Sequence, residues 1–151
     1  MYAVSLTTPV GEIVVVEEDD HIVRVRWSTE SRQDKTPLLR NVSEQIAAYF
    51  RNDLTAFDLP LRPGGSEFQR DVCDAMLAIP FGETRTYGEL AEGLGVFAQA
   101  VGQACGHNPI PIIIPCHRVL GANGLGGFSG GEGIETKMQL LRHEGAFPYL
   151  L

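Results

Sequence analysis

The sequence of 151 residues lacks the marks of several large protein classes. It has no uninterrupted apolar run long enough to cross a bilayer, and its N-terminus has no basic segment ahead of an apolar one. We therefore expect neither a membrane span nor a signal peptide, and we expect the protein in the cytoplasm. Hydrophobic residues make up 44% and charged residues 21% of the chain, which is typical of a folded globular protein.

Cysteine is scarce, with three residues at positions 73, 105 and 116. An odd number without a CxxC pair indicates neither a disulfide framework nor a zinc site. Residues 1–62 contain no cysteine and a single histidine, His21. We therefore expect no structural metal.

Positive charge is also in short supply. The net charge is −7, shared as −3 in residues 1–62 and −4 in residues 63–151. Nucleic-acid-binding proteins usually carry a basic footprint. Any contact with DNA must therefore come from a local patch of the surface.

The first part of the chain predicts a small antiparallel meander. Runs of β-branched and alternating apolar residues over 2–6, 12–17 and 21–27 are separated by turn residues. Thr36 and Pro37 then form a helix start, and apolar residues at helical spacing continue to Phe50. This half of the sequence is typical of an α/β domain.

The second part predicts mostly helices. The segment 60–66 is rich in proline and glycine and is the best candidate for a linker, and Ser66 caps a helix that Pro80 ends. Thr86 begins the next helix with a capping box, and Gly95 ends it. With a further short helix over 97–105, this pair predicts a helix-turn-helix.

Three prolines bracket an isoleucine run in the segment 107–119, and seven glycines follow within 121–133. Such glycines allow the backbone to approach a ligand closely. The last predicted helix runs over 134–143, with Ile134, Met138 and Leu141 expected to face inward.

Cys116 is the strongest candidate for a reactive group. A thiol reacts as its thiolate, and the adjacent His117 and Arg118 are of the kind that lowers a thiol pKa. Glu144 is available to orient the histidine, as in other chains of nucleophile, base and orienting group. The alternative is that Cys116 is a small buried hydrophobic residue.

The wider motif resembles the O-6-alkylguanine-DNA alkyltransferases, also called methylated-DNA–protein-cysteine methyltransferases. The similarity rests on NPIPIIIPCHRV over 108–119, GFSGG over 127–131, LLRHEG over 140–145 and IPFGETRTYGELA over 79–91. It implies an α+β protein, with a ribonuclease-H-like structural domain over 1–62. A DNA-binding and alkyl-acceptor domain would cover 63–151.

The resemblance implies a single irreversible transfer without a cofactor. An alkylated guanine is flipped out of double-stranded DNA, and its O-6 alkyl group passes to a cysteine. An alkyl group on O-4 of thymine would be a second substrate. Carried over by motif, Cys116 is the acceptor, His117 takes its proton through a water, and Glu144 lies behind the histidine. A protein that acts once needs no partner subunit, so we expect a monomer.

Other matched positions would complete the pocket. Asn108 would brace the active-site turn, Tyr87 would donate a hydrogen bond to the departing guanine, and Ser129 would contact its oxygen. Each has a plainer alternative: Tyr87 could pack at a helix start, Ser129 could be a turn residue, and Glu144 could be a solvated carboxylate.

Two positions depart from the family pattern. Cys73 stands where relatives usually have a tryptophan, and we expect this to be a packing change in the core. The other departure lies in the recognition helix. Where the recognition helix of relatives carries an arginine that fills the space of the flipped base, this chain has Gln99, and residues 97–105 contain no Lys or Arg. We expect weak affinity for DNA, because phosphate neutralisation supplies much of such binding. Arg85, Arg118 and Arg70 remain to contact phosphates, although Arg118 could instead brace the turn. Val119, the end of the PCHRV element, is assigned to the substrate site with them.

Two further functions stay open. The chain could be a lesion-binding module that has lost efficient transfer, or a thiol protein that acts on an alkyl donor other than DNA. The retained Cys116, His117 and Glu144 disfavour the first. The acidic surface and Gln99 favour the second, whereas Tyr87 and Ser129 suit a guanine pocket. We expect the N-terminal domain to support the other domain structurally, since it contains no motif.

Overall fold

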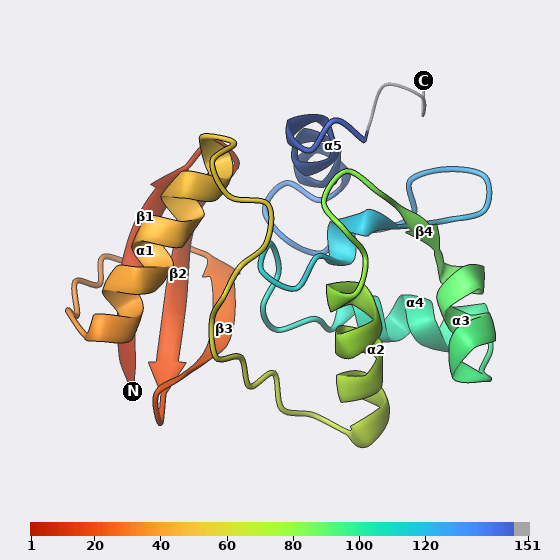
Figure 1. The fold of residues 1–151 in the computed structure, drawn as a ribbon, viewed down its shortest axis with the longest axis horizontal. Coiled ribbons are helices and arrows are strands. Elements are labelled where there is room, and N and C mark those ends of the chain that lie inside the picture. Colours follow the sequence, from red (N-terminus) through yellow and green to blue (C-terminus); the bar gives the residue numbers. More distant parts are fainter. Residues whose placement is uncertain (147–151) are drawn as a thin grey trace.

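A computed structural model describes residues 1–146, and it opens with a three-stranded antiparallel sheet in the order β1-β2-β3 (Figure 1). The strands are β1 (Tyr2–Thr8), β2 (Gly11–Glu18) and β3 (His21–Trp27). Asp19 and Asp20 join β2 to β3 with φ values of 49° and 61°, as a tight hairpin turn requires. The predicted meander is confirmed.

Helix α1 (Pro37–Phe50) covers one face of this sheet (Figure 1). It begins as predicted, because the Thr36 hydroxyl accepts a hydrogen bond from the Leu39 amide and proline occupies the first turn. Its inner face buries Leu39, Val42, Ile46 and Tyr49. These side chains share one core with Ile13, Val15 and Ile22 of the sheet.

The chain between α1 and α2 is partly attached to the sheet. The Ile22 amide in β3 donates to the Pro60 carbonyl at 2.8 Å, and the Arg62 amide donates to the Ile22 carbonyl at 2.9 Å. The first residues of the predicted linker therefore lie along the edge of β3.

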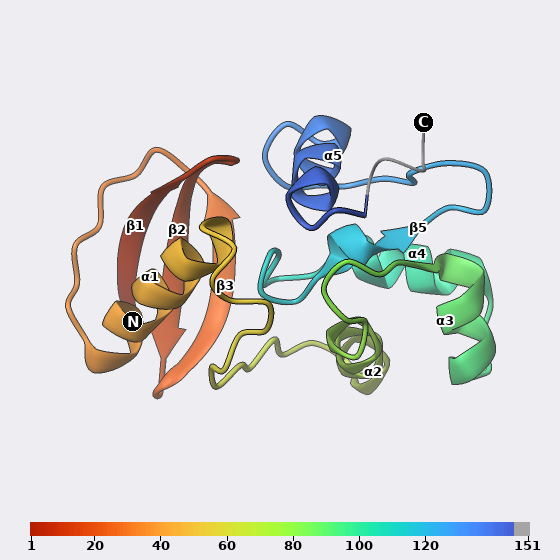
Figure 2. The same cartoon turned by 45° about the horizontal axis from the view of Figure 1, so that its top comes forward.

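The second half is mostly helical. Its first helices are α2 (Glu67–Leu77), α3 (Tyr87–Leu94) and α4 (Ala98–Gly106). The predicted capping box between Thr86 and Glu89 starts α3, and Gly95 ends it in the left-handed region with φ of 69°. Helix α4 packs beside α3, so the predicted helix-turn-helix is present (Figure 2).

Three short elements were not predicted in this half. Strand β4 (Arg85–Thr86) pairs in parallel with β5 (Val119–Leu120), and the 3-10 helix η1 (Cys116–Arg118) precedes β5. Helix α5 (Ile134–His143) has the predicted bounds, and its predicted inner face is confirmed at the buried Leu141 and at Met138, which packs against the same cluster, but not at Ile134. Ile134 is 46% exposed at its first position, and the buried face carries Thr136, Lys137, Leu140 and Leu141.

The two halves share a single hydrophobic core. One cluster of buried residues joins Ile13 and Val15 of the sheet to Val72, Ile114 and Leu140 of the helical half. The Val25 amide in β3 also donates to the Pro109 carbonyl at 2.9 Å. The α+β architecture is thus confirmed, and the segment 107–120 lies between its two parts (Figure 2). Within residues 1–146, no helix has the length and apolar character of a membrane span.

Candidate active site

The turn that presents Cys116 is buried and tightly braced. Every residue from 110 to 120 is buried. Asn108 donates from its side-chain amide to the Ile114 carbonyl at 2.8 Å, and its side-chain oxygen accepts from the Ile110 amide at 3.0 Å. Ile112 has a φ of 72°, which is strained for a β-branched residue and persists only where the surroundings enforce it. Asn108 therefore braces the turn that ends in Cys116.

Behind Cys116 lies a buried carboxylate with three partners, which together form the Glu144 network. His117 Nε2 lies 2.8 Å from Glu144 Oε2. Arg118 donates from Nε to Oε1 at 2.8 Å and from Nη2 to Oε2 at 2.9 Å. The Tyr49 hydroxyl, which comes from α1 in the N-terminal half, donates to Oε2 at 2.6 Å. Glu144 is thus a buried, fully engaged group and not a solvated carboxylate.

The protonation states of the network follow from this geometry. Burial alone would raise the pKa of Glu144, but the hydrogen bonds from His117 and Arg118 and the charge of Arg118 outweigh it and hold the pKa far below its usual value. Burial also lowers the pKa of His117, against the opposing pull of Glu144. A neutral His117 beside an ionised carboxylate donates from Nε2, so its Nδ1 carries a free lone pair. That Nδ1 is buried and has no hydrogen-bond partner within residues 1–146.

Burial of the Cys116 thiol favours its protonated form. Cys116 is 8% exposed, and burial raises its pKa, although a hydrogen bond with Asn108 and the charge of Lys137 act in the opposite direction. The expectation that its neighbours in sequence lower this pKa is therefore corrected. Arg118 directs its charge to Glu144, and His117 is neutral, so neither stabilises the thiolate.

Lys137, a cation whose charge acts on the thiol, is one that sequence reasoning missed. Lys137 of α5 is fully buried, and burial lowers its pKa to about 8. Its Nζ donates to the Val119 carbonyl at 2.7 Å and to the Gly127 carbonyl at 3.1 Å, and lies 5.7 Å from the centre of the Tyr87 ring. A lysine on the inner stripe of an amphipathic helix is the sequence signal that could have revealed it.

A cavity of about 410 Å³ opens above Cys116. It is lined by Tyr87, Gly102, Cys105, Gly106, Cys116, Gly127, Phe128 and Ser129. The Gly127 amide donates to the Tyr87 hydroxyl, and burial raises the pKa of this hydroxyl. Ser129 is exposed and its hydroxyl donates to the Gly106 carbonyl at 3.2 Å. The structure therefore brings Tyr87 and Ser129 to the same cavity as the thiol.

Two residues assigned to substrate or DNA contact are placed elsewhere. The Arg118 side chain is 8% exposed, and besides Glu144 it holds the Ile79 carbonyl at 2.6 Å. It braces the site and does not reach a phosphate. The Val119 side chain is fully buried within β5, because the turn and β4 enclose it, so its side chain does not face a substrate.

The remaining candidates lie on the surface. Arg85 pairs with Glu83 at 3.1 Å, and Arg70 donates to the Gly65 carbonyl at 2.6 Å. Gln99 is exposed on α4 and lines a hollow next to Tyr87 and Gly102, beside the cavity of Cys116. Phe97, which the sequence did not single out, is 85% exposed at the start of α4.

The described residues 1–146 contain no group of three or more His, Cys, Asp or Glu side chains arranged to hold a metal ion. The chemistry that this site offers is that of a thiol beside a neutral histidine. The histidine is fixed by an ionised carboxylate, and a cavity lies over the sulfur.

Comparison with known proteins agrees with this arrangement. The model of the ribonuclease-like domain of 6-O-methylguanine DNA methyltransferase matches residues 1–63, and that of its DNA-binding domain matches residues 67–146. The chain is 40% identical to a methylated-DNA–protein-cysteine methyltransferase of Methanosarcina acetivorans, over 97% of this chain and 99% of that protein. It is 38% identical to the constitutive enzyme of that name from Bacillus subtilis, over 95% and 94%.

A solved structure is similar over the same length. Mycobacterium tuberculosis OGT, crystallised in complex with DNA, superposes with a TM-score of 0.86 at 38% identity, over 97% of this chain and 94% of that one. Matches of this extent cover both halves of the fold and the braced thiol between them. The chain belongs to the 6-O-methylguanine DNA methyltransferase family.

Proposed function

We propose that the protein repairs DNA by moving the alkyl group of O-6-alkylguanine irreversibly onto Cys116, with O-4-alkylthymine as a second substrate of the same chemistry. The observation that carries this proposal is the position of Cys116, under a cavity of about 410 Å³ and in front of the Glu144 network. The names of the relatives in Methanosarcina acetivorans and Bacillus subtilis support the same reaction.

The reaction begins with a proton transfer. Because the pKa of Cys116 is raised, the thiol needs a base, and His117 offers its Nδ1 lone pair. The proton passes through a water to this nitrogen, and the ionised Glu144 stabilises the imidazolium that forms. Lys137 then favours the thiolate through its charge.

The transfer itself exchanges one bond for another. The Cys116 sulfur bonds to the alkyl carbon while the bond from that carbon to the guanine oxygen breaks. The electron pair stays on the guanine, where Tyr87 and Ser129 stabilise the developing charge by hydrogen bonds, and the proton held by His117 returns to the released base. The thioether is stable and the thiolate is itself the acceptor, so each molecule acts once and needs no cofactor.

DNA binding would use the helix-turn-helix. Helix α4 carries no charged residue, and both Gln99 on the helix and Phe97 at its N-cap are exposed. Gln99 would fill the space of the flipped base without adding a charge, and Phe97 would supply the apolar contact that groove-inserted side chains make. With few phosphate contacts, we expect weak binding that depends little on salt.

The protein would work as a monomer in the cytoplasm, with the alkyl-acceptor domain beginning near residue 63. Its three cysteines are free and buried, which suits a reducing compartment.

Intact mass measurement tests the function. The protein is mixed with a duplex that contains one O-6-methylguanine, and we expect a gain of one methyl group on Cys116 that Cys116→Ala does not show. Cys73→Ala, a second buried thiol outside the cavity, should still gain the methyl group. Binding of the lesion without a mass gain would favour the lesion-binding module. Failure to bind DNA would favour a thiol protein with another alkyl donor.

A further inference from the structure

The front wall of the cavity is a glycine loop that we define as residues 126–131. Its members Gly127, Phe128 and Ser129 line the cavity over Cys116. The polar contacts that hold it from the C-terminal half are made by Lys137 and Tyr87 with Gly127, by Ser129 with the Gly106 carbonyl and by the Gly133 amide with the Gly130 carbonyl. Any further contact that holds this loop in place therefore determines the shape of the cavity.

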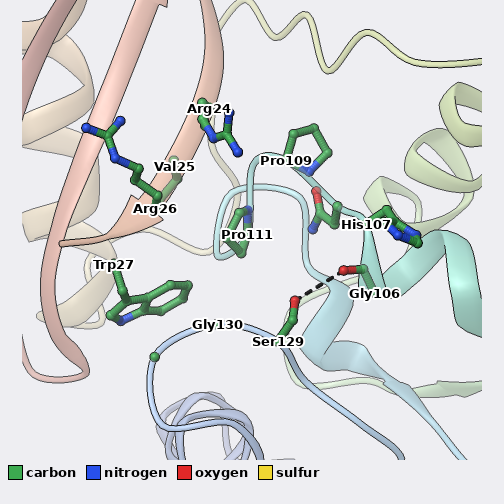
Figure 3. A pocket seen from close by; sticks show the side chains of 12 residues that line it. Arg24, Val25, Arg26, Trp27, Gly106, His107, Pro109, Pro111, Ser129 and Gly130 are labelled. Carbon is green, nitrogen blue, oxygen red and sulfur yellow. Dashed lines mark hydrogen bonds between the residues drawn. The ribbon is translucent and has the colours of Figure 1, made fainter.

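A side chain of the N-terminal half packs against the loop. Trp27 ends β3, and its indole Nε1 donates to the Val10 carbonyl at 2.9 Å, which fixes the plane of the ring. The ring meets Phe128 edge-on at 6.0 Å between centroids. Figure 3 shows the indole next to Gly130. Both residues line a hollow of about 530 Å³, and its lining also includes Ser129 and Gly106.

The contact between Trp27 and Gly130 leaves no room for a side chain. A Cβ at Gly130 would lie 2.2 Å from Cζ3 of the indole and 2.8 Å from two further ring carbons. The φ of Gly130 is outside the left-handed region, so its backbone conformation is open to any residue. The indole is therefore the reason for a glycine at this position. At Gly131, in contrast, a φ of 50° and the Thr136 hydroxyl also require glycine.

We propose that Trp27 is a positioning residue, by which the N-terminal half sets the wall of the alkylguanine cavity. The inference rests on the proposed function and adds to it a role for a domain that carries no motif. Trp27 acts through Phe128 and Gly130, and it touches neither the thiol nor the Glu144 network.

The first test uses a steric clash and its relief. We expect Gly130→Ala to slow methyl transfer from a lesion duplex about tenfold or more, because displacements near 1 Å cost catalysis up to about a hundredfold. Gly124→Ala is the matched control, since a Cβ there meets no atom within 4 Å and its φ is ordinary. Its rate should equal that of the unmodified protein.

The double variant Trp27→Ala/Gly130→Ala separates positioning from general damage. With the indole gone, the added methyl group has room, so the double variant should transfer as fast as Trp27→Ala alone. A double variant slower by the product of the two single effects would overturn the inference. So would a Gly130→Ala protein as fast as Gly124→Ala.

The second test is spectroscopic and does not need transfer. Trp27 is the single tryptophan of the chain, so intrinsic fluorescence reports on this contact alone. In Cys116→Ala, which cannot accept the alkyl group, we expect the O-6-methylguanine duplex to shift the emission and an undamaged duplex of the same sequence to leave it unchanged. Identical spectra with both duplexes would count against the inference. Absence of methyl transfer in the unmodified protein would instead refute the proposed function, which keeps the two failures apart.

Discussion

The two walls around Cys116 are built on opposite principles. Behind the thiol, Glu144 receives hydrogen bonds from Tyr49, His117 and Arg118, all buried and close to ideal length. In front of it, the glycine loop is held by a few hydrogen bonds to its backbone groups and by packing against one indole. The rear wall, formed by the Glu144 network, therefore has one arrangement, whereas the shape of the front wall, formed by the glycine loop, depends on its neighbours.

This difference shows which part of the site tolerates change. Removal of one charge from a buried ion pair destabilises the folded protein, because the remaining charge stays buried without its partner. The backbone of a glycine-rich loop can shift at a small cost in free energy, because glycine has access to many backbone conformations. Substitutions should accordingly affect stability behind the thiol and transfer rate in front of it.

The largest effect is expected from Glu144→Gln. Arg118 would lose its counter-charge while still buried, so we expect the free energy of unfolding to fall by about 3–5 kcal/mol and transfer to be lost. Glu135→Gln, an exposed change on the same helix, should stay within about 0.5 kcal/mol. Denaturant unfolding measures the stability of both variants. Equal stability would show that the Glu144 network is no more sensitive to substitution than an exposed position.

Lys137→Met sharpens the comparison, because this lysine ties the loop to the site. The folded pKa of about 8 lies below the usual 10.5, so the unfolded chain binds more protons between these values. The stability of the unmodified protein should therefore rise from pH 8 to 10.5, relative to Lys137→Met, by about 3 kcal/mol. Parallel stability curves for the two proteins would show that Lys137 titrates normally.

Tyr49→Phe removes one hydrogen-bond donor from the Glu144 network and leaves its charges unchanged. We expect a loss of about 1.5 kcal/mol of stability, typical of a hydrogen bond to a charged group, and slower transfer. Tyr2→Phe, at a tyrosine that is 55% exposed, should change neither quantity. If Tyr49→Phe also has no effect, the N-terminal half does not contribute to the network.

The smallest effect is expected outside both walls, on α4. Gln99→Arg should steepen the dependence of duplex binding on salt, with a slope larger by about 0.9 for each phosphate contacted. Gln103→Arg adds the same charge to the same helix and is the matched control. Faster methyl transfer in Gln99→Arg alone would support a special role for position 99, and equal rates would remove it.

Local signals in the sequence predicted most of the secondary structure. Thr36, Ser66 and Thr86 cap their helices as predicted, and Gly95 ends α3, because caps depend on a few adjacent residues. The pair β4 and β5 was missed, since two-residue strands have no periodicity and form only when distant segments meet.

The residues of the candidate site could be predicted where a sequence motif contains them. They could not be predicted where their position depends on tertiary packing. Cys116, His117, Glu144 and Asn108 were found from the motif, and they lie together in the structure. Arg118 was assigned in part to DNA because a sequence does not show which arginine is buried. Tyr49 was interpreted as an apolar residue of α1, and its hydroxyl meets Glu144 only through the contact of the two halves.

The hydrogen bond from Val25 to the Pro109 carbonyl has a consequence for how the molecule comes apart. Because the shared core and the Tyr49 hydroxyl also join the two sequence modules, we expect them to unfold as one cooperative unit. A chain cut at residue 62 would leave Glu144 short of a donor and would open the apolar surface around Ile114. We therefore expect no separate unfolding transition at the modular boundary in the sequence, and we expect Cys116 to stay buried only while both modules are folded.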